Sequence, residues 1–89
     1  MQADHDQVLK RLKTARGQLA GIIKMVEEDQ YCVDISNQIL ATEALLRSTN
    51  KLILHAHLSH CVLESMNADE KEREEKIEEI KRLLDKLLK

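Results

Sequence analysis

The stretch VDISNQILATEALLRSTNKLILHAHLSHCVLES, residues 33–65, runs without a proline or a glycine. At a rise of 1.5 Å per residue, one helix over this stretch spans roughly 50 Å. Its apolar residues fall on more than one side, so we expect other helices to cover it. Polar residues gather in its middle and indicate a solvated or inter-subunit segment: Thr42, Ser48, Thr49 and Asn50.

A helix is predicted before this stretch, starting at Asp4 or Asp6, either of which can cap it, and ending near residue 28. Its apolar stripe recurs in alternating steps of three and four residues: Val8, Leu12, Ala15, Leu19, Ile22 and Val26. Gly17 and Gly21 lie in mid-helix, where glycine costs about 1 kcal/mol relative to alanine. We interpret them as a place where another helix approaches closely.

A third helix is predicted over about residues 70–88, with Asp69 at its start and Glu72 in a capping-box arrangement. The composition also favours helix, because the 89 residues are 43% hydrophobic yet only 1% aromatic, with no proline. So small a chain buries only a modest core, which favours oligomerisation. We therefore predict one all-α domain over residues 1–89, with three helices per chain, paired as an antiparallel dimer around a four-helix core.

Charge is distributed unevenly along the chain. The formal net charge is −2, but residues 1–26 hold five basic and two acidic residues, a local charge of +3. The first residues are polar and acidic rather than a secretory signal, and no apolar run approaches a membrane span. Two cysteines in such a chain favour reduced thiols. We expect a cytoplasmic protein that does not insert into a membrane.

Sulfur and imidazole donors are concentrated near the end of the long helix. His57 and Cys61 are four residues apart and therefore point the same way, whereas His55 and His60 fall off that face. Cys32 is the only other thiol, and two thiols with one imidazole form a soft donor set that suits Cu(I). Cys32 and Cys61 are roughly 43 Å apart along one helix, so they cannot meet within one chain. In an antiparallel dimer, Cys32 of one subunit meets His57 and Cys61 of the other.

Four segments, in this order and spacing, resemble the copper-sensitive operon repressors, the CsoR family: residues 11–22 (RLKTARGQLAGI), residues 25–35 (MVEEDQYCVDI), residues 38–39 (QI) and residues 57–62 (HLSHCV). The resemblance covers nearly the whole chain. It implies a helical dimer that assembles into a tetramer, a dimer of dimers. It also implies that the tetramer binds operator DNA without a helix-turn-helix and releases it when its thiols are occupied.

The candidate ligand positions distinguish the branches of that family. The copper branch carries Cys, His and Cys where this chain has Cys32, His57 and Cys61. The nickel/cobalt branch replaces the last Cys by His and uses an N-terminal His, a role to which His5 is not clearly aligned. The formaldehyde branch lacks the last Cys, and the persulfide branch keeps both Cys but typically lacks the His. The pattern therefore indicates copper.

The resemblance also implies residues around the metal and at the DNA. A Tyr beside the first Cys and a Glu of the third helix are expected to support the ligands, here Tyr31 and Glu79, with Glu78 or Glu75 as alternatives for the latter. Tyr31 could equally be a packing residue. Basic residues of the first two helices are expected at the DNA: Arg11 foremost, then Lys10, Lys13, Arg16, Arg47 and Lys51. Ser48 stands where some relatives have Arg.

From these residues we predict a Cu(I)-responsive transcriptional repressor that binds operator DNA in its apo form. One alternative is a persulfide sensor of the same family that links Cys32 and Cys61 of two subunits. A more remote alternative is a copper buffer or chaperone that does not bind DNA. An enzyme is not expected, because no set of nucleophile, base and orienting group is recognisable.

Overall fold

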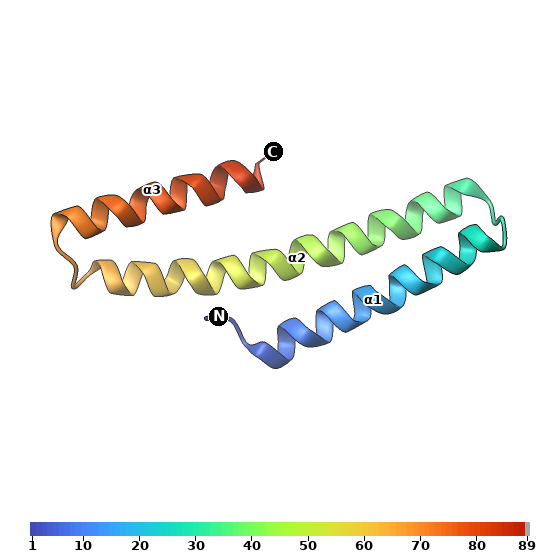
Figure 1. The fold of residues 1–89 in the computed structure, drawn as a ribbon, viewed down its shortest axis with the longest axis horizontal. Coiled ribbons are helices and arrows are strands. Elements are labelled where there is room, and N and C mark those ends of the chain that lie inside the picture. The colour runs from blue at the N-terminus through green and yellow to red at the C-terminus, as the bar shows by residue number, and fades with distance from the viewer. Residues whose placement is uncertain (89) are drawn as a thin grey trace.

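The computed structural model describes residues 1–88, and within them the chain forms three helices and no strand: α1 (His5–Glu27), α2 (Cys32–Ser65) and α3 (Glu70–Leu87). Figure 1 shows α1 lying antiparallel to the first half of α2, and α3 folding back along its second half. The molecule measures 59 × 28 × 13 Å, so it is little more than one helix thick in its shortest dimension. The predicted all-α fold of three helices per chain is confirmed.

Local capping explains where two of the helices begin. The Asp4 side chain accepts a hydrogen bond from the Gln7 N–H (3.2 Å), so Asp4 and not Asp6 is the cap of α1. The Asp69 side chain accepts from the Glu72 N–H (2.8 Å) at the start of α3. Both starts follow from short-range chemistry that is visible in the sequence.

The turn between α1 and α2 depends on Asp29, whose φ of 52° lies in the left-handed region. The Gln30 N–H donates to the Met25 carbonyl and the Asp29 N–H donates to the Val26 carbonyl, each at 3.0 Å. This pair of bonds is a Schellman motif, which usually places glycine where Asp29 stands. It reverses the chain so that α1 runs back along α2.

The contact between α1 and α2 uses a narrow seam. Val8, Ala15 and Ile22 recur every seven residues and are buried against α2, where Thr42 and Thr49 are also buried. The expectation of a solvated or inter-subunit polar segment is wrong for these two threonines. The Thr42 hydroxyl is satisfied by the Gln18 side chain (2.8 Å), and the Thr49 hydroxyl donates to the Leu45 carbonyl (2.8 Å). Because their hydroxyls have partners, these small side chains can lie in the seam.

The two glycines of α1 do not serve a contact within the chain. A Cβ added at Gly17 or at Gly21 would meet no atom within 4 Å. Any close approach at these positions must therefore come from a second molecule.

One side of the α1–α2 hairpin remains apolar and uncovered. We define the open apolar face by five residues that are 43–58% exposed. Four of them lie four positions after a seam residue (Leu12, Leu19, Val26 and Leu46), and Ile39 lies three positions before Thr42. Four residues forward turn a helix by about 40° beyond a full turn, and three residues backward turn it by about 60° in the same sense. Because α1 and α2 are antiparallel, these rotations point to the same side of the hairpin from both helices, so the five residues form one face.

The accessible surface of the chain is larger than its mass requires. It amounts to 7066 Å² for 10.3 kDa. A compact monomer of this mass exposes about 5,400 Å², which leaves an excess of about 1,700 Å².

Among the described residues, no helix combines the length and the apolarity needed to cross a membrane.

Candidate metal centre

The last third of α2 holds a thiol and an imidazole on one face. Cys61 Sγ lies 3.5 Å from His57 Nε2, one helical turn away, as the spacing of four residues requires. Cys61 is buried with 2% exposure, whereas the His57 side chain is 38% exposed. The sulfur is therefore shielded from solvent, whereas solvent can reach part of the imidazole.

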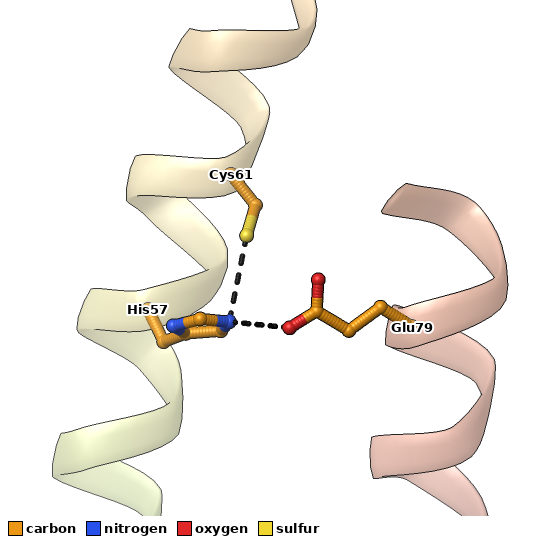
Figure 2. A group of neighbouring side chains, drawn as sticks. All are labelled: His57, Cys61 and Glu79. Carbon is orange, nitrogen blue, oxygen red and sulfur yellow. Dashed lines mark hydrogen bonds and ion pairs between the residues drawn. The ribbon is translucent and has the colours of Figure 1, made fainter. Parts of the chain in front are cut away.

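Helix α3 adds a carboxylate to this pair. His57 Nε2–H donates to Glu79 Oε1 at 3.1 Å, and Figure 2 shows Glu79 reaching across from α3 to the imidazole edge that also faces the sulfur. The three side chains each offer one ligand atom, and these atoms lie within 4.8 Å of one another. Of the three glutamates considered for this position, Glu79 is the one that contacts His57. Glu78 instead accepts from Lys81 (3.3 Å), and Glu75 lines a separate depression near the α2–α3 turn.

A charged network continues from the site towards the α2–α3 turn. Lys76 Nζ lies 3.2 Å from Glu64 Oε2 and 4.0 Å from Glu79 Oε2, and Glu64 Oε1 accepts from His60 Nε2 (2.9 Å). The hydrogen bond and the charge of Lys76 lower the pKa of the Glu64 carboxyl, and the same pair raises the pKa of Lys76. The sequence prediction missed Lys76, although its position three residues before Glu79 could have indicated it.

The other two residues predicted at the centre lie at the opposite end of α2. Cys32 is its first residue and is exposed, and Tyr31 is the cap position before it, with 66% exposure. Both thiols are free. The chain thus brings His57, Cys61 and Glu79 together and leaves Tyr31 and Cys32 roughly 40 Å away along the helix.

The predicted DNA-binding residues lie along α1 and the middle of α2. Arg11 is half-buried and its guanidinium donates to the carbonyl and the hydroxyl of Ser48, each at 3.4 Å. This contact places Arg11 at the level of Arg47 and Lys51, which are exposed. The remaining candidates are also exposed and lie on α1: Lys10, Lys13 and Arg16.

Two solved structures share this fold. The nickel-responsive transcriptional regulator InrS is 26% identical, with a TM-score of 0.85 over 98% of this chain and 96% of that one. The copper-sensing repressor CsoR with Cu(I) from Geobacillus thermodenitrificans NG80-2 is 36% identical, with a TM-score of 0.82 over 94% of this chain and 85% of that one. The fold is therefore that of a class of all-helical transcriptional regulators.

The sequence defines the family within that class. The family described as metal-sensitive transcriptional repressor matches residues 4–86, and the chain belongs to it. The resemblance noted from the sequence is thereby confirmed.

Named relatives share a large part of the chain. The copper-sensing transcriptional repressor CsoR of Bacillus subtilis (strain 168) is 40% identical over 70 residues, which cover 79% of this chain and 69% of that protein. CsoR of Mycobacterium ulcerans is 53% identical over 53 residues, 60% of this chain and 45% of that protein. RicR of Mycobacterium tuberculosis, also a copper-sensing repressor, is 49% identical over 57 residues, 64% and 59% respectively. The chain spans about half the length of these two mycobacterial relatives.

Proposed function

We propose that this chain is a Cu(I)-responsive transcriptional repressor that holds operator DNA in its apo form and releases it when Cu(I) binds. The observation that carries the proposal is the buried Cys61 thiol set 3.5 Å from His57, with a second free thiol, Cys32, exposed at the far end of the same helix. In support, the Cu(I)-bound CsoR structure has this fold, and several relatives are named as copper sensors.

The donor set fits Cu(I). Two thiolates and one imidazole are soft ligands that suit this ion and give it three coordination bonds. Cys61 and His57 already face one another, but Cys32 cannot reach them within its own chain. The proposed site is therefore completed by Cys32 of a second subunit, whose exposure leaves it available.

Dimerisation is supported by the surface of the single chain. The excess of about 1,700 Å² is roughly twice the 800 Å² that each partner contributes to a standard interface. The open apolar face supplies one such area, and four-helix packing of two antiparallel hairpins would cover it. The excess also leaves room for a second contact, in line with the proposed dimer of dimers.

DNA binding is assigned to the basic residues of α1 and α2. The contact between Arg11 and Ser48 groups the α1 residues with Arg47 and Lys51, and residues 1–26 carry a charge of +3. Lysine and arginine contacts to phosphate displace counterions, so the affinity for DNA should fall steeply with salt. The whole chain, residues 1–89, would then act as one domain that both binds DNA and senses the metal.

Coupling between the two sites is assigned to His57 and Glu79. Because His57 Nε2–H donates to Glu79, Nδ1 is the nitrogen that remains for a metal while this bond persists, and the ring must turn Nδ1 towards Cys61 Sγ, which now faces Nε2. A ligating imidazole held in this way transmits its position to α3. Release of DNA then requires that Cu(I) bind more tightly to the assembly that holds DNA poorly.

A subunit-mixing experiment tests the shared site. Cys32→Ala chains lack one half of every site and Cys61→Ala chains lack the other half, so neither variant alone should bind Cu(I) tightly. In an equimolar mixture that has exchanged subunits, each mixed dimer holds one intact site and one site without thiols. Half of the dimers in such a mixture are mixed, so a symmetric dimer should show about one tight Cu(I) site for every four chains. Absence of any recovery, in dimers shown to have mixed, would exclude a site shared between subunits.

Two other functions use the same residues and give different results. Both thiols are free, so a persulfide sensor would release DNA on polysulfide treatment and gain mass as Cys32–Cys61 links between chains. A copper sensor should release DNA without any covalent adduct. A copper buffer would bind Cu(I) but would not shift a DNA fragment taken from upstream of its own gene.

A further inference from the structure

We propose that His57, Cys61 and Glu79 of a single subunit form a zinc site that is distinct in its ligands from the Cu(I) site shared between subunits. The proposal does not depend on copper sensing, because it uses side chains that one chain already brings together. The ligand atoms of these three residues lie within 4.8 Å of one another. They come from two helices, so a bound ion would join α3 to α2.

Two of the three ligand separations agree with a tetrahedral zinc ion. With bonds of about 2.3 Å to sulfur, 2.05 Å to nitrogen and 2.0 Å to oxygen, a tetrahedron has edges of about 3.5 Å from sulfur to nitrogen and about 3.3 Å from nitrogen to oxygen. The structure has 3.5 Å from Cys61 Sγ to His57 Nε2 and 3.1 Å from Nε2 to Glu79 Oε1. The same nitrogen makes both contacts. The third separation, from Cys61 Sγ to the Glu79 carboxylate oxygen, is at most 4.8 Å and would close by up to about 1.3 Å to reach the tetrahedral edge of about 3.5 Å.

The ligand types select zinc over Cu(I) for this arrangement. A carboxylate oxygen is a poor ligand for Cu(I), whereas zinc accepts sulfur, nitrogen and carboxylate oxygen together. The thiolate of Cys61 and the carboxylate of Glu79 supply two negative charges, which balance a divalent ion. On binding, the Cys61 thiol gives its proton to solvent, and His57 loses the Nε2 proton that faces Glu79 and takes one from solvent on Nδ1. The fourth position stays open to water.

The surroundings favour binding through one carboxylate oxygen. Lys76 Nζ lies 4.0 Å from Glu79 Oε2, whereas Oε1 is the oxygen that faces His57. The lysine can thus hold the outer oxygen while the inner one binds the ion. Helix α3 has no buried residue of its own, so a metal link at Glu79 would be its firmest attachment to α2.

The two metals would use His57 and Cys61 in turn and cannot occupy them together. Cu(I) takes its third ligand from Cys32 of another subunit, whereas zinc takes Glu79 from the same subunit. Zinc should therefore bind to chains that lack Cys32, and it should stabilise α3 without linking subunits. This difference in the third ligand allows the two sites to be tested separately.

The test is a titration of the reduced, metal-free protein with Zn(II) against a chromophoric chelator, repeated with Co(II) as a spectroscopic probe. The wild-type protein should bind one Zn(II) per chain, and the Co(II) form should show a thiolate charge-transfer band with tetrahedral ligand-field intensity. Cys32→Ala should retain this affinity. Glu79→Gln should bind Zn(II) at least tenfold more weakly while it still binds Cu(I). The helical circular dichroism of this variant shows whether it has folded. The matched control is Glu78→Gln, whose exposed side chain contacts Lys81 and should leave Zn(II) affinity unchanged.

Two results would overturn the zinc site. One is Zn(II) binding that is lost in Cys32→Ala but kept in Glu79→Gln, which would mean that zinc uses the copper ligands. The other is a wild-type protein that binds no Zn(II) although it binds Cu(I), which would leave the proposed copper function intact.

Discussion

Replacing Leu19 by alanine should weaken the proposed dimer through the open apolar face. Leu19 lies in the middle of α1 and is 50% exposed in the single chain. Complete burial of a leucine side chain contributes about 1.5–3 kcal/mol, so burial of the exposed half in an interface contributes about 1 kcal/mol. A two-fold dimer contains the residue twice, and the loss is therefore about 2 kcal/mol, or a dissociation constant about 30-fold higher.

Sedimentation equilibrium over a range of protein concentrations measures this constant. The thermal midpoint should also be lower in Leu19→Ala at equal protein concentration, because folding and association are linked. Lys24→Ala is the matched control, since it truncates a long side chain on the opposite side of α1. Among the described residues this side chain pairs only with Glu28, at 3.8 Å and exposed. Equal dissociation constants for Leu19→Ala and Lys24→Ala would refute the assignment of this face to the dimer.

Three further substitutions test how local contacts within one chain contribute to its stability. Asp29→Gly should raise the free energy of unfolding by about 0.5–1 kcal/mol in chemical denaturation, because glycine adopts the φ of 52° without strain. Gly17→Ala should add about 1 kcal/mol through helix propensity, and a loss instead would reveal a second molecule packed against that position. Lys76→Met should destabilise the protein most near neutral pH. The pKa of Glu64 is lowered in the folded state, so the contribution of the pair disappears as acid protonates Glu64. The pKa of Lys76 is raised, so the contribution disappears again as alkali deprotonates Lys76, which pH-dependent melting can follow.

Features decided by neighbours in sequence were predictable. The caps at Asp4 and Asp69 depend on bonds to residues three positions away, and the facing of His57 and Cys61 depends on one helical turn. The absence of proline from a long apolar stretch sufficed to predict α2, since no local signal opposes the helix there.

Features decided by packing between helices were not predictable. Thr42 is buried because Gln18, 24 positions earlier, accepts its hydroxyl hydrogen, and the polar character of Thr42 gave no sign of this. Glu79 was named ahead of Glu75 and Glu78 only through the family resemblance, because the choice among them depends on how the turn after Ser65 sets α3 against α2. Cys32 illustrates a further limit, because its proposed partners belong to another subunit.

Release of DNA by Cu(I) is the property that defines the proposed repressor, and it can be measured directly. Fluorescence anisotropy should follow a labelled DNA fragment from upstream of the gene, saturated with reduced apo protein, while Cu(I) is added from a buffered source. Wild-type protein should leave the DNA as Cu(I) approaches one equivalent per chain. Cys61→Ala protein, which retains every basic residue of α1 and α2, should stay bound. Release of Cys61→Ala at the same Cu(I) concentration, or persistence of the wild-type complex with Cu(I) bound, would show that the protein is not a repressor released by Cu(I) at this site.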